Sequence, residues 1–146
     1  MRVIEQDTVK LLRECDSGAK MGVSSIDDVL GAVHAKELER LLTDCKQEHE
    51  KLSGEIQAHL DRFQDEGRDP SVMAEKMAGM MTSMKLMMHE SDHTIADLMT
   101  DGCNMGVKSL SRYLNQYKAA DEVSKDIAKR LIHLEAQLAV DIRPYL

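Results

Sequence analysis

Three side chains in this sequence have the type and spacing to act as metal ligands on helices. Glu90 and His93 form a Glu-x-x-His pair, which places a carboxylate and an imidazole on adjacent turns of one helix. His49 occupies an apolar seam position between Cys45 and Leu52, where an imidazole needs a hydrogen-bond partner or a metal. A solvated helix face, for the pair, and a hydrogen-bonded core histidine, for His49, are the alternative interpretations.

Two further acids extend this set. Glu135 lies one turn from Leu131 and Leu138, so a small rotation of its helix turns the carboxylate inward. Glu14 lies beside Cys15 near the middle of the first expected helix. The candidate metal ligands are therefore Glu14, His49, Glu90, His93 and Glu135. For both added acids, an exposed or boundary position is the alternative.

Methionine is concentrated in one region, because nine of the eleven lie between residues 73 and 105. Thioethers bind Cu(I) or haem iron, so the run invites a copper hypothesis. The residues Met73, Met77, Met80, Met84 and Met87 follow strict four-three spacing, however, which is typical of a buried helix seam. We expect a flexible, gap-filling core there, with an adaptable surface for a partner or an apolar ligand as the alternative.

The cysteines predict neither a disulfide framework nor a zinc knuckle. Cys15, Cys45 and Cys103 are odd in number, far apart and without a Cys-x-x-Cys pair. Each lies in an apolar helical context with no adjacent activating base, so we expect small buried apolar side chains.

Length and charge exclude several classes of protein. A chain of 146 residues is the size of one domain, and we expect residues 1–146 to form it.

The chain has 19 Lys and Arg against 26 Asp and Glu, so its net charge is −7, and the basic residues are dispersed. This charge pattern argues against nucleic acid as a partner. No apolar run approaches the about 20 residues of a membrane span. Acids near the N-terminus, where a signal peptide is apolar, predict a cytoplasmic protein.

The elements that position these residues are expected to be all α-helical. Apolar residues recur at threes and fours over 4–31, 38–63, 73–98 and 123–142, and helix-forming residues dominate. Gly31 is expected to end the first helix, and Pro70 with Ser71 to start the third. Short connections predict an antiparallel up-down-up-down four-helix bundle. A third helix running to residue 116 would be too long, so we expect a kink or break near Gly102 to Gly106.

A short internal sequence repeat, which we call the internal echo, indicates two related helical hairpins. The segments 21–26 and 105–110 match at an offset of 84, including Gly22 and Gly106. Both glycines would permit close helix approach. Chance convergence of small-residue contacts is the alternative.

In these features the chain resembles the ferritin-like four-helix-bundle superfamily. Members that bind two irons place a Glu on two helices and Glu-x-x-His on the other two, and Glu90 to His93 is the one match to that element here. Lys46 stands three residues before His49, and Leu138 three after Glu135, so a complete di-iron set does not carry over. The resemblance implies either a bundle without metal or a mononuclear or altered site holding iron or manganese.

Three functions follow from these patterns. The first is a non-enzymatic bundle that acts by self-association or partner binding, expected as a homo-oligomer. The second is a ferritin-like protein that oxidises or stores iron or manganese. The third is a Met-lined groove that binds an apolar ligand or helix. No phosphate loop, nucleophile elbow or His-Glu-x-x-His motif supports another chemistry, and whether the protein is an enzyme stays open.

Overall fold

The computed structural model describes residues 3–88 and 90–146, and in these ranges the chain is all-α. The described residues form five α-helices and a short 3₁₀-helix. They are α1 (Val3–Leu30), α2 (Lys36–Asp61), α3 (Val72–Met88), α4 (Asp92–Gln116), α5 (Glu122–Asp141) and η1 (Arg143–Tyr145). None of the helices described is both long and apolar enough to cross a membrane.

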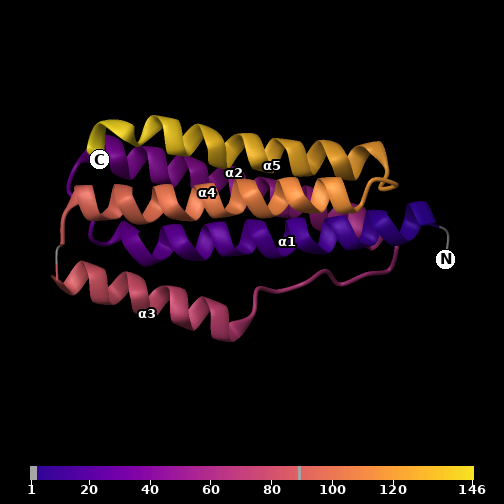
Figure 1. The fold of residues 1–146 in the computed structure, drawn as a ribbon, viewed down its shortest axis with the longest axis horizontal. Coiled ribbons are helices and arrows are strands. Elements are labelled where there is room, and N and C mark those ends of the chain that lie inside the picture. Colours follow the sequence, from indigo (N-terminus) through magenta and orange to yellow (C-terminus); the bar gives the residue numbers. More distant parts are fainter. Residues whose placement is uncertain (1–2, 89) are drawn as a thin grey trace.

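The four long helices pack together, and α3 lies outside them against α1 and α4 (Figure 1). In Figure 1, α1 and α5 run in one direction and α2 and α4 in the other, and the segment carrying α3 crosses from one end of the molecule to the other. The expected count of four helices in up-down-up-down order is therefore wrong. The third helix of that scheme is two helices, one of which lies in the crossover.

In the methionine-rich region α3 ends at Met88 and α4 begins at Asp92, and the expected break near Gly102 to Gly106 is wrong. Both glycines lie within the continuous helix α4. Ser91 starts α4, because its hydroxyl accepts a hydrogen bond from the Thr94 backbone N–H at 3.1 Å. Serine at this position satisfies a backbone N–H that the first turn of a helix leaves unpaired. A glycine inside a helix lowers helix stability by only about 1 kcal/mol relative to alanine, so it does not interrupt the helix.

Other helix ends agree with the sequence. The first helix ends at Leu30, directly before Gly31, and α3 begins after Pro70 and Ser71. The last segment ends at Asp141, with Pro144 inside η1.

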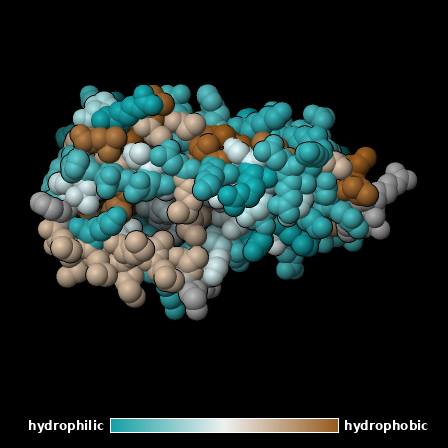
Figure 2. Space-filling model, viewed as in Figure 1, coloured by the Kyte–Doolittle hydropathy of each residue, from teal (hydrophilic) through white to brown (hydrophobic). Residues whose placement is uncertain are grey.

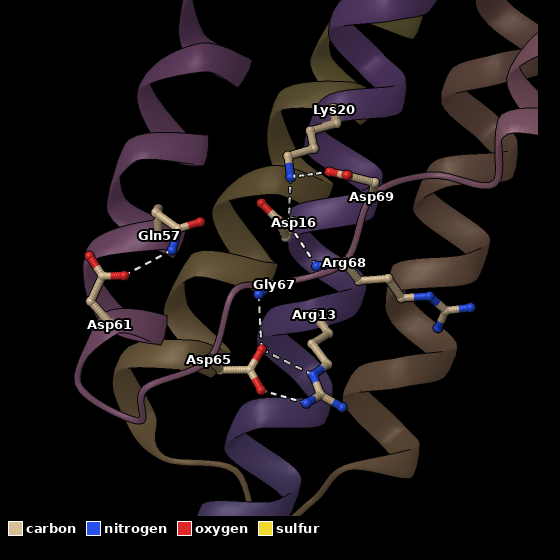
Figure 3. Close-up of polar contacts among 9 residues, drawn as sticks. All are labelled: Arg13, Asp16, Lys20, Gln57, Asp61, Asp65, Gly67, Arg68 and Asp69. Carbon is tan, nitrogen blue, oxygen red and sulfur yellow. Dashed lines mark hydrogen bonds and ion pairs between the residues drawn. The ribbon is translucent and has the colours of Figure 1, made fainter.

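The segment between α2 and α3 is fixed to α1 by polar contacts (Figure 3). The Asp16 side chain is almost fully buried and accepts hydrogen bonds from the Arg68 backbone N–H and from Lys20 Nζ, both at 2.9 Å. Gly67 has a φ of +85°, and a Cβ there would lie 2.5 Å from Asp16 Oδ2. Only glycine fits this backbone, so the close approach of the segment to α1 depends on it.

The apolar core is divided into two clusters along the bundle. One contains Leu12, Ile56 and Leu131, and the other contains Leu42, Ile95 and Ile142. Along all four long helices, the residues between the two clusters form a distinct layer, and that layer holds the candidate site.

Candidate functional site

The layer between the two core clusters contains a buried histidine and a buried glutamate. His49 of α2 is 2% exposed and Glu135 of α5 is 8% exposed. The His49 Nε2 and Glu135 Oε1 atoms are 3.6 Å apart, slightly beyond hydrogen-bond length. Neither His49 Nε2 nor Glu135 Oε2 has a hydrogen-bond partner within the described residues. Since buried polar atoms are normally paired, this pair of side chains calls for a chemical explanation.

Two glycines make room for these side chains. A Cβ at Gly22 of α1 would lie 2.5 Å from His49 Cδ2, and one at Gly106 of α4 would lie 2.0 Å from Glu135 Oε2. Each hairpin, α1 with α2 and α4 with α5, thus places a glycine of its first helix against a polar side chain of its second. These are the glycines of the internal echo, which therefore has a structural counterpart at the centre of the bundle.

The hydrogen bonding of His49 fixes which of its two ring nitrogens carries a proton. Its Nδ1 donates to the Cys45 carbonyl oxygen at 2.8 Å, and a carbonyl oxygen only accepts, so Nδ1 carries a proton. A neutral imidazole of this tautomer would present a lone pair to Glu135, and an ionised carboxylate presents only acceptors. A hydrogen bond between them therefore needs one further proton, on Nε2 or on the carboxyl group.

The other three candidate ligands lie elsewhere. Glu14 of α1 is half-buried and pairs with the Arg68 guanidinium. Glu90, before α4, and His93, in its first turn, are exposed. Of the five residues, the structure thus brings together His49 and Glu135 alone.

The donor set does not fit a two-metal centre. Over the described ranges 3–88 and 90–146, no group of three or more His, Cys, Asp or Glu side chains is arranged to hold a metal ion. His49 and Glu135 offer one imidazole nitrogen and one carboxylate, whereas even a catalytic zinc ion has three protein ligands. We therefore assign no step to a metal at this site, and binding of iron or manganese stays a prediction.

The cysteines are free and buried, as the sequence predicted. Burial raises the pKa of Cys15, Cys45 and Cys103 to about 12, so each stays a protonated thiol in neutral solution. We expect Ellman's reagent at about pH 8 to react with all three thiols in urea and with none at a comparable rate in the folded protein. One thiol that reacts in the folded protein at the rate of a free cysteine would contradict this burial.

A second candidate site is the outer face of α3, where the sequence predicted a buried core. Its members are at least 57% exposed, and we refer to them as the Met surface. They are Met77, Met80, Met81, Met84, Met87 and Met88. Figure 2 shows a continuous, moderately apolar face over α3 beside the largely hydrophilic bundle. For these residues the expected core is wrong.

The inner face of α3 explains why the methionines face outward. The positions toward the bundle are small or polar: a Cβ on Gly79 would lie 3.6 Å from Asp28 Oδ2, and Ser24 Oγ donates to Glu75 Oε2 at 3.4 Å. Among the side chains of α3 that the structure describes, Leu86 packs against the core. The sequence contains a signal for this orientation of α3. The small residues Ala78, Gly79 and Thr82 mark the side on which α3 approaches α1 closely.

Comparison with protein-family models, with curated proteins and with solved structures found no match to this chain. The ferritin-like resemblance therefore gains no support from a relative. What the protein does is argued below from the contacts, burial and charges of its own residues.

Proposed function

We propose that this protein is a non-enzymatic interaction module that acts through the Met surface, by self-association or by binding a partner protein. The observation that carries the proposal is the exposure of six methionines on one helix of 17 residues. Large contiguous apolar patches on a folded protein typically mark interaction sites. Methionine suits this role because its flexible, polarisable side chain adapts to the surface it meets.

The size of the Met surface matches a protein interface. Full burial of a methionine contributes about 1.5–3 kcal/mol, which at about 25 cal/mol per Å² corresponds to about 100 Å² of apolar surface. The six side chains are on average about two-thirds exposed, so they present roughly 400 Å². A standard interface buries about 800 Å² on each partner, a little over half of it apolar. The Met surface therefore supplies nearly all the apolar area that such an interface needs.

Charge favours an apolar helix or groove as the occupant. No charged residue lies between Lys76 and Lys85, so the centre of the surface can be desolvated without burying a charge. The chain as a whole carries −7, which disfavours nucleic acid. We also propose a cytoplasmic location, which the free thiols support because that compartment is reducing.

A ferritin-like metal protein is the second proposal, and the topology and His49 favour it. A four-helix bundle with one long crossover is the connectivity of ferritin-like folds, and the segment between α2 and α4 is such a connection. His49 also donates Nδ1–H to a backbone carbonyl, as metal-ligating histidines typically do. This proposal ranks second because His49 and Glu135 supply only two potential ligands. Elemental analysis of protein incubated aerobically with ferrous iron tests it, since a metal-free product would contradict it.

Photo-crosslinking tests the interaction module. The protein is expressed in cells supplied with photo-methionine, a diazirine analogue, then irradiated and mapped by mass spectrometry. We expect cross-links from residues 77–88 to one defined protein surface. Met105, 70% exposed on α4 and outside the Met surface, is the internal control. Cross-links from Met105 as frequent as those from α3, or none from α3, would contradict the proposal.

A further inference from the structure

We propose that the occupant of the Met surface is the same surface of a second copy of this chain, with the two α3 helices packed antiparallel. This inference rests on the proposed function, because it names the partner of the same surface. It starts from the spacing of the exposed side chains. Met77, Met80, Met84 and Met87 are separated by three, four and three residues, and all four face solvent.

This spacing selects a helix as the partner. A three-four repeat averages 3.5 residues, the period at which one helix meets another along a continuous seam. An irregular apolar pocket or a flat sheet does not require that period. The seam of α3 is open because its small and polar residues, including Gly79 and Glu75, contact α1 instead. A helix carrying a matching seam would cover it completely.

The seam of a second copy matches when the two helices are antiparallel. Met77 then lies opposite Met87 of the second copy, and Met80 lies opposite Met84 of the second copy. A two-fold axis near position 82 relates the halves, so each of these four methionines is paired in one closed arrangement. Such a self-complementary interface closes as a dimer and leaves no open end for further growth.

Charge placement agrees with this pairing. The seam has no charged residue between Lys76 and Lys85. In the antiparallel arrangement the two Lys76 side chains lie at opposite ends of the interface and do not face each other. Lys85 lies to the side of the seam, one residue beyond Met84. Two copies can thus desolvate the centre without placing like charges together.

Sedimentation of the purified 146-residue chain tests the partner. We expect the wild type to sediment over a concentration series as a dimer of the 16.4 kDa chain. The double variant Met80→Glu, Met84→Glu should weaken dimerisation by more than about 30-fold, because each chain places two charges in the centre of the interface, four in all. Met105→Glu adds a charge at an exposed methionine of α4 and should leave the dimer intact. Circular dichroism of all three proteins checks that helix content is unchanged.

Disulfide trapping tests the register. A mixture of Met80→Cys and Met84→Cys chains should form a mixed disulfide-linked dimer faster than either variant alone, whereas Met105→Cys should not cross-link. A wild type that stays monomeric at every concentration would overturn the inference, as would a dimer that survives the double glutamate substitution. Faster cross-linking of each variant with itself would overturn the antiparallel register. If the purified protein is monomeric while α3 cross-links to a different chain in cells, this inference fails and the proposed function stands.

Discussion

Glu135→Ala is expected to lower the free energy of unfolding by about 3 kcal/mol, and Glu135→Gln by less than about 1 kcal/mol. Alanine removes the polar group that faces the Nε2 of His49 at 3.6 Å, at a position where the ring is 2% exposed. Removing one member of a buried polar pair carries the full desolvation cost of the other. Glutamine keeps the length of the side chain and supplies an N–H that can donate to Nε2.

The difference between the two substitutions follows from the tautomer of His49. Its Nδ1 proton is committed to the Cys45 carbonyl oxygen, so Nε2 needs a donor. In the wild type the Glu135 carboxyl group faces Nε2 at 3.6 Å, and in Glu135→Gln the amide N–H can donate to it. Urea unfolding followed by circular dichroism measures both variants. Equal destabilisation by alanine and glutamine would show that Nε2 does not need a donor from this side.

A matched acid on the surface controls for loss of charge. Glu48 is an exposed residue on α2, one position before His49, and Glu48→Ala should change stability by no more than about 0.5 kcal/mol. A similar loss in Glu48→Ala and Glu135→Ala would point to net charge, and not to the buried pair, as the cause.

The sequence predicted where helices form, because their buried faces leave a local pattern. Leu38, Leu42 and Ile56 of α2 were expected inside from their spacing, and all three are fully buried. Gly31 and Pro70 marked helix ends through their own backbone preferences. Information of this kind is contained within about four residues, so it can be read from a single sequence.

The same spacing could not say what covers an apolar face. The methionines of α3 follow the seam pattern of a buried helix, and the pattern is identical whether the covering helix belongs to the same chain or to another. Within the described residues no helix covers the Met surface.

The start of α4 also depends on distant contacts, since Asp92 accepts hydrogen bonds from the backbone N–H groups of His34 and Ala35, more than 50 residues away.

The candidate site was predicted in part, and the two residues that meet were both selected by their place among apolar residues. His49 stands within the apolar spacing of a long helix, and Glu135 lies one turn from Leu131 and Leu138, where a small rotation was needed to turn it inward. Glu90 and His93 were selected by a short motif alone, and a motif does not report which side of a helix is buried. Asp16 was missed although it is 1% exposed, because its partner Arg68 lies 52 residues away in a segment without regular structure.

Gly106→Ala is expected to destabilise the protein by about 1–3 kcal/mol, whereas Gly102→Ala in the same helix should stabilise it by up to about 1 kcal/mol. Alanine favours a helix over glycine at both positions. At Gly102 an added Cβ meets nothing within 4 Å, but at Gly106 it would lie 2.0 Å from Glu135 Oε2 and 2.7 Å from Glu135 Cδ. The buried carboxylate must then move away from His49 or displace core side chains.

A double-mutant cycle separates this clash from other effects of the substitution. If the cost of Gly106→Ala arises from Glu135, it should vanish in a Glu135→Ala background, where Gly106→Ala should stabilise as much as Gly102→Ala does. Urea unfolding of the four proteins gives a coupling free energy that we expect near 2 kcal/mol. The α1–α2 hairpin offers an independent pair, since a Cβ at Gly22 would lie 2.5 Å from His49 Cδ2 and one at Gly54 meets nothing within 4 Å. Equal effects at Gly22 and Gly54 would contradict a common role for the two echo glycines, because each is argued to make room for the polar side chain of its own hairpin.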